Sequence, residues 1–145
     1  MMAPVLALAL VAGAPLKVAT VPVLLEGAPI GLSGVDAAVD RALTWRPGLQ
    51  GLRYDEIEAL APGAALAVRN CGSDRRCLAD TLQSTGAQRA LVIVVRPNQQ
   101  QWVVTAQLVD LVAARVQASA SKNSAGDGGQ TIQEVVGSVA EEGGY

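Results

Sequence analysis

The chain has 145 residues, 50% of them hydrophobic and only 3% aromatic, with a formal net charge of -2. That length suits one domain with one core, and the hydrophobic content excludes a disordered chain. The absence of histidine excludes Ser-His-Asp and Cys-His catalysis and every zinc site that needs an imidazole.

Residues 1–14 are apolar and uncharged, which predicts a signal peptide, and 12–14 (Ala-Gly-Ala) has the small-x-small form of a cleavage site. The stretch is too short to span a bilayer as a helix, which needs about 20 residues. We therefore expect no transmembrane span after its removal. The domain would then cover 16–142, followed by a short tail at 143–145. The alternative is that 1–14 is retained, either as a buried strand or helix or as an apolar arm that needs a partner surface.

The first half of the domain predicts strands and helices in alternation. Residues 16–26 read as a strand that is apolar on both faces, as for a strand covered on two sides, and Pro22 marks an edge position or a bulge. Ser33 and Asp36 predict the start of an amphipathic helix that ends near Trp45. The remaining elements of this half are a short strand at 49–54, a helix opened by Asp55 with Glu58, and a helix at 64–70.

The second half predicts a helix, three antiparallel strands and a last helix. Ser73 or Asp74 caps the first helix, which ends near Thr85. A capping box of Thr131 with Glu134 opens the last helix. The strands lie at 89–96, 101–110 and 115–121.

Cys71 and Cys77 are the only cysteines and lie six positions apart. In a continuous helix six residues rise about 9 Å, whereas the Cα atoms of a disulfide lie about 4.4–6.8 Å apart. A bond therefore requires the chain to fold back, which the intervening 72–74 (Gly-Ser-Asp) permits. Export makes such a bond the expected state. The alternatives are two reduced thiols or a redox-active pair, while a metal site would lack enough neighbouring ligands.

Three stretches resemble a known group of bacterial envelope domains. They are 17–22 (KVATVP), 71–87 (CGSDRRCLADTLQSTGA) and 102–110 (WVVTAQLVD). They are similar, in that order, to the opening strand, the C-x5-C-L-A helix and the aromatic-x-L-T-x-x-L-V-D strand of two groups of proteins. These are periplasmic domains like the N-terminal domain of TolB, and FlgO-type outer-membrane proteins. The nearest resemblance is to envelope proteins of myxobacteria and their relatives. The similarity spans residues 17–139.

The chain departs from that pattern in one strand and one turn. Members of the group often carry Gly-Ser where this chain has Ile93 and Val94. They often close the next hairpin with a Thr-Gly turn after the position of Asp110, where this chain has 111–114 (LVAA). The type of that turn is therefore left open.

The resemblance implies an α/β (α+β) fold, with helices packed mainly on one face of a small mixed sheet of about four to five strands. It also implies a non-enzymatic binding or scaffolding role in the periplasm or cell envelope, with no cofactor or metal and with another envelope protein as partner. The strand at 115–121 is the expected edge, where a partner could add a strand. For any single residue the favoured alternative is that Arg115 and Lys122 only blunt that edge.

The residues alone bear on three other classes of function. A nucleic-acid partner is not expected, because the arginines are scattered and form no basic stripe. A cytoplasmic accessory protein would retain 1–14 as an apolar arm in an oligomer. An enzyme could use a carboxylate pair, although most of the acids sit where a helix cap or an exposed helix face explains them. Those acids are Asp36, Asp40, Asp55, Glu56, Glu58 and Asp80.

Overall fold

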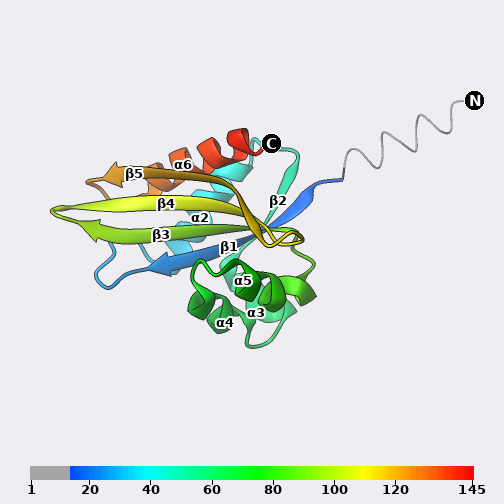
Figure 1. The fold of residues 1–145 in the computed structure, drawn as a ribbon. Helices are drawn as coiled ribbons and strands as arrows, with labels where there is room; N and C mark the ends of the chain where they lie inside the picture. Colours follow the sequence, from blue (N-terminus) through cyan, green and yellow to red (C-terminus); the bar gives the residue numbers. More distant parts are fainter. Residues whose placement is uncertain (1–13) are drawn as a thin grey trace, which may run out of the picture.

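The computed structural model describes residues 14–145, which form one five-stranded sheet with α-helices packed on it (Figure 1). The strands are β1 (Leu16–Leu24), β2 (Leu49–Leu52), β3 (Arg89–Asn98), β4 (Gln101–Asp110) and β5 (Arg115–Ser124). The helices are α2 (Leu32–Leu43), α3 (Tyr54–Leu60), α4 (Ala64–Cys71), α5 (Arg75–Leu82) and α6 (Gly129–Glu142). No helix of the described range is long and apolar enough to cross a membrane. Apart from Ala14, the predicted signal peptide lies outside the described residues.

The α/β class and the mixed sheet predicted from the sequence are confirmed. The strand order is β2-β1-β3-β4-β5, with β1 parallel to β2 and β3 and the later pairs antiparallel. β1 is covered on two sides as predicted, since Val18 and Val21 are both fully buried, in the cores on opposite faces. Pro22 lies beyond the last β1–β2 pair, so it occupies the edge position that the sequence predicts.

The helices cover both faces of the sheet, which corrects the expectation that they pack mainly on one. Residues of α2 and α6 share a core with Val18 and Leu91, whereas α3, α4 and α5 share the other with Val21 and Val92. In Figure 1 these two groups lie on separate sides of the strands. The cause is the strand order. β2 and β3 lie on opposite sides of β1, so the chain crosses the sheet in one direction from β1 to β2 and in the other from β2 to β3. Right-handed crossovers in opposite directions place their helices on opposite faces of the sheet.

Three predicted helix caps are wrong. Asp55 does not open α3, whose N-cap is Arg53, with Glu56 completing the capping box. Glycine opens the other two helices. α2 begins after Gly31 with no side-chain cap, so Ser33 lies inside the helix. α6 begins after Gly128, whose φ is 90°, and Thr131 therefore lies within its first turn. Glu134, the other half of the predicted capping box, instead pairs with a lysine of β5.

Residues 143–145, predicted as a short tail, pack against the domain. The Tyr145 hydroxyl oxygen accepts hydrogen bonds from Arg89 Nε at 3.2 Å and from Gln117 Nε2 at 3.3 Å. The backbone nitrogen of Tyr145 donates to the carbonyl of Ala140 at 2.8 Å. These bonds join the segment to β3, β5 and α6.

Candidate functional site

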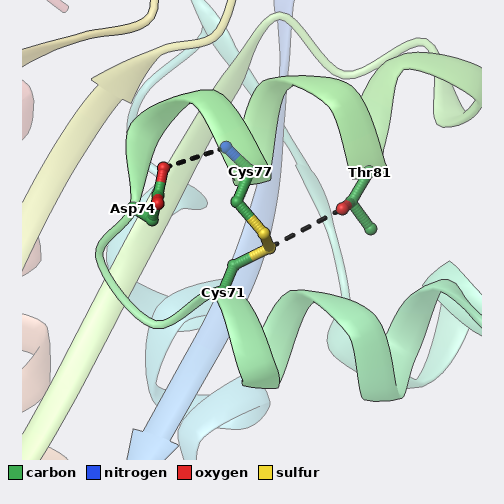
Figure 2. Close-up of a disulfide and its surroundings, with 4 residues drawn as sticks. All are labelled: Cys71, Asp74, Cys77 and Thr81. Atoms are coloured by element: carbon green, nitrogen blue, oxygen red, sulfur yellow. Dashed lines mark hydrogen bonds between the residues drawn. A yellow bond between two sulfur atoms is a disulfide. The ribbon is translucent and has the colours of Figure 1, made fainter.

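The structure contains a disulfide between Cys71, the last residue of α4, and Cys77, in the first turn of α5 (Figure 2). Their Cα atoms lie 5.5 Å apart. Gly72, with a φ of 58°, turns the chain back between the helices, a conformation that glycine adopts with little strain. Asp74 caps α5, one of the two caps predicted there, since its Oδ1 accepts a hydrogen bond from the Cys77 nitrogen at 3.1 Å. The Thr81 hydroxyl donates to Cys71 Sγ at 3.6 Å.

The disulfide ties together two helices that cover the second face of the sheet. Val68 of α4 and Leu78 and Leu82 of α5 are fully buried, in the same core as Val21 of β1. In the chain-entropy model, closing so small a loop stabilises the folded state by about 2 kcal/mol. Within residues 14–145 there is no free cysteine and no group of three or more His, Cys, Asp or Glu that could hold a metal ion.

Asp36 caps a neighbouring helix instead of its own. The residue is 2% exposed. Its Oδ1 accepts a hydrogen bond at 2.7 Å from the backbone nitrogen of Tyr54, the first residue of α3, and its Oδ2 accepts one from the Asp55 nitrogen at 3.4 Å. Burial raises the pKa of Asp36, and the two N–H groups, which favour the charged carboxylate, oppose that rise only in part. The carboxylate is therefore a structural link between α2 and α3.

Most of the other candidate acids are bound by an arginine or by the backbone. Asp40 and Asp55 both pair with Arg53, at 3.4 Å and 3.5 Å. Burial raises the pKa of Asp40, and the Arg53 guanidinium opposes that rise. Glu56 accepts a hydrogen bond from the Arg53 nitrogen at 3.0 Å, and Glu58 accepts from backbone nitrogens at the start of α4. These contacts agree with the structural roles expected for acids at helix ends.

The strand β5 forms one edge of the sheet and runs to Ser124, three residues past the predicted end at Ser121. Its only partner strand in the described part of the chain is β4. The pairing is regular from Ala118 to Ser124, and a register shift lies opposite Leu108 and Val109 at the other end. From Ala118 to Ser124, one side of β5 therefore has no partner strand within residues 14–145.

Few charges blunt this edge. Lys122 pairs with Glu134 of α6, and Arg115 lies on the other side of the register shift. Between them Ser119 and Ser121 are small and exposed. The opposite edge strand, β2, has only four residues, so β5 offers the longer edge for pairing with a partner strand.

The turn that joins β4 to β5 is held in place by Asp110. Asp110 Oδ1 accepts hydrogen bonds from the nitrogens of Val112 and Ala113, at 2.9 Å and 3.1 Å, and lies 3.4 Å from the Arg89 guanidinium. Burial acts to raise the pKa of Asp110, but these hydrogen bonds and the charges of Arg89 and Arg115 outweigh it and hold the pKa below its usual value. An aspartate before a loop is a recognised turn signal, so Asp110 could have predicted this turn from the sequence.

A groove of about 450 Å³ lies between this turn and α5. The sequence alone does not reveal this groove, because its two walls are about thirty positions apart in the chain. Asp80, the remaining candidate acid, lines this groove and is exposed. The lining residues are Arg76, Ala79, Asp80, Gln83, Ala87 and 111–114.

The same fold occurs in solved structures of bacterial proteins. The C-terminal domain of LpoB from Salmonella enterica matches 85% of this chain and 94% of that domain, with a TM-score of 0.58 and 13% identity. TolB from Acinetobacter baumannii matches 90% of this chain with a TM-score of 0.56 and 12% identity, and this chain spans only 28% of the TolB chain. A PelC dodecamer from Paraburkholderia phytofirmans matches 88% of this chain and 85% of the PelC chain, with a TM-score of 0.50 and 13% identity.

At these identities the similarity establishes the fold alone. In sequence, the chain matches neither a protein family nor a curated protein. The resemblance to TolB is therefore supported at the level of structure. The resemblance to FlgO-type proteins and to envelope proteins of myxobacteria stays a prediction.

Proposed function

We propose that this chain is a binding or scaffolding module of the bacterial periplasm or cell envelope that acts through contacts with another envelope protein. The bonded pair of Cys71 and Cys77 supports this compartment, since disulfides persist where the surroundings are oxidising. The apolar stretch 1–14 is typical of an export signal. The chain shares its fold with TolB, one of the proteins that the sequence also resembles.

The role is non-enzymatic. Asp36, Asp40 and Asp55 are each engaged with backbone nitrogens or with Arg53. A carboxylate that is committed to capping a helix or to an ion pair is a poor general acid or base, because its proton transfer would cost those contacts. These contacts support a structural use for the acids.

The observation that carries the proposal is the free edge of β5. A strand edge presents backbone N–H and C=O groups to which an extended segment can hydrogen-bond. Ala118 and Ala120 belong to the α6 side of β5, and Ser119 and Ser121 alternate with them on the other side. A partner strand with apolar residues on one face and polar residues on the other would fit this edge.

Site-specific photo-crosslinking in cells that produce the full chain tests the contact. A photoreactive amino acid at Ser119 or Ser121 is expected to form an adduct with a discrete envelope protein. Gln50 on β2 is the matched control, because it is an exposed polar residue on the opposite edge strand. Adducts from Gln50 alone, or none from either serine, would contradict strand addition at β5.

The compartment is tested separately by cell fractionation with thiol labelling. We expect the chain in the periplasmic or envelope fraction, with Cys71 and Cys77 resistant to alkylation until they are reduced. Mass spectrometry of the native N-terminus distinguishes the cytoplasmic alternative, in which 1–14 is retained as an apolar arm. A chain that still begins at Met1 or Met2 would favour that alternative.

A further inference from the structure

The stretch of β5 between Ala118 and Ser124 lacks the features that usually protect an edge strand. It contains no proline, and its pairing with β4 is free of register shifts. Its only charged residue is Lys122, which is paired with Glu134 of α6. Because one side of this stretch has no partner strand within residues 14–145, its backbone N–H and C=O groups are open to a second strand.

The same stretch, ASASKNS, is complementary to itself in one antiparallel register. A two-fold axis through Ser121, perpendicular to the sheet, places residues 118–124 of one copy opposite residues 124–118 of a second copy. The pairs are Ser121 with itself, Lys122 with Ala120, Ser119 with Asn123, and Ala118 with Ser124. No like charges face each other across the strands, a contact that would destabilise the pairing. This register uses the whole regular stretch and stops short of the register shift.

The register also balances the charges near the axis. Lys122 lies one position from Ser121, and its ion-pair partner is Glu134 of α6. Each copy therefore brings one lysine and one glutamate to the neighbourhood of the axis, and the positive and negative charges are equal in number. A second copy of β5 is thus electrostatically complementary to this edge.

From these features we infer that β5 pairs with β5 of a second copy of this chain, which joins two five-stranded sheets into one symmetric dimer. Because the axis is perpendicular to the sheet, the α6 side of one copy continues into the α6 side of the other. The inference rests on the proposed function for the use of this edge, and it adds a regulation of that edge. Pairing over residues 118–124 gives a small interface, so a partner strand that binds more tightly would displace the second copy.

Sedimentation equilibrium of the purified, disulfide-bonded protein measures the dimer. We expect a Kd of about 10 μM to 1 mM, as for a small interface. Oxidation of Ser121→Cys tests the axis, because opposite Cα atoms in antiparallel strands lie about 4.5–5.5 Å apart and those of a disulfide about 4.4–6.8 Å apart. We expect a covalent dimer from this variant and none from Gln50→Cys, whose cysteine is also exposed but lies on β2.

Two matched double variants test the register. Ser119→Glu with Asn123→Glu places an acid opposite an acid in both of the affected pairs, whereas Ser119→Glu with Asn123→Lys places an acid opposite a lysine. The Kd of the first variant should exceed that of the second by about tenfold or more. Both variants change the same two exposed positions, which lie about 13 Å apart along one strand and so do not pair within a copy. Circular dichroism verifies that each variant is folded.

Three results would overturn the inference. They are a protein that stays monomeric at about 1 mM, equal crosslinking of Ser121→Cys and Gln50→Cys, and the same Kd for the two double variants. None of them bears on the proposed function, which stands if photo-crosslinking at Ser119 or Ser121 in cells captures another envelope protein. Conversely, adducts in cells that contain only a second copy of the chain would support the dimer and refute the proposed partner.

Discussion

Asp36 of α2 and the backbone nitrogen of Tyr54 in α3 are joined by a hydrogen bond of 2.7 Å. The two helices belong to cores on opposite faces of the sheet, so this bond links the two layers. The residue is buried, and its removal would leave the first N–H groups of α3 without an acceptor.

Asp36→Ala is therefore expected to lower the free energy of unfolding by about 1–3 kcal/mol, the cost of leaving buried donors unpaired. Urea denaturation measures the change. Asp80→Ala is the control, because Asp80 is exposed and caps no helix, and we expect a change within about 0.5 kcal/mol. Equal effects of the two substitutions would contradict the role of Asp36.

The raised pKa of Asp40 predicts that Asp40→Asn stabilises the protein at pH 7. An acid whose folded pKa lies above its usual 3.8 binds more protons in the folded state, so its contribution to stability falls as pH rises from 3.8 through the raised pKa. The asparagine side chain mimics the protonated acid and avoids that loss. Urea denaturation at pH 7 and below pH 3.8 should show an advantage of the variant that disappears in acid. An advantage that is independent of pH would refute this reading.

The lowered pKa of Asp110 predicts the opposite change in stability when this acid is replaced by its amide. Its carboxylate contributes stability above pH 3.8, and that contribution is lost as pH falls through the lower pKa of the folded state. Asp110→Asn should destabilise the protein at pH 7, and the difference from the unsubstituted chain should shrink below pH 3.8. The same denaturation series measures it. A loss of equal size at both pH values would show that the charge of Asp110 does not hold the turn.

Removal of the disulfide is expected to loosen the α4–α5 layer. Replacing Cys71 and Cys77 together by serine should lower the free energy of unfolding by about 2 kcal/mol. A reductant should bring the unsubstituted chain to the same stability and leave the double variant unchanged, as denaturation with and without reductant would show. A reductant that leaves the unsubstituted chain unaffected would contradict the structural role of the bond.

Leu82 and Leu66 provide a matched pair on the same helical hairpin. Leu82, the last residue of α5, is fully buried, whereas Leu66 of α4 is 64% exposed. Leu82→Ala should cost about 2–5 kcal/mol, and Leu66→Ala should stay within about 0.5 kcal/mol. Thermal or chemical denaturation of the two variants compares them. Similar losses would mean that the hairpin does not pack on the sheet as described.

Local patterns predicted most elements because their signals lie within a few residues of each other. The alternation at 101–110 and the apolar run at 89–96 became β4 and β3. Asp74 was one of two caps expected for α5, and it is the cap that forms. The caps predicted at Ser33 and Thr131 do not form, because the signal that marks the start of each helix is missing from the sequence. Each helix begins after a glycine, which offers no side-chain signal, so the nearest hydroxyl residue was chosen instead.

By itself the sequence determined the strands, the buried helical stripes and the turn that allows Cys71 and Cys77 to meet, since each depends on neighbours along the chain. Only the tertiary structure decided the strand order, and with it the division of the helices between two faces. It also decided that Asp36 caps α3 and that α5 and the turn after Asp110 enclose a groove. These features join segments that are distant in the chain, and their pairing depends on how the whole sheet buries its two apolar faces.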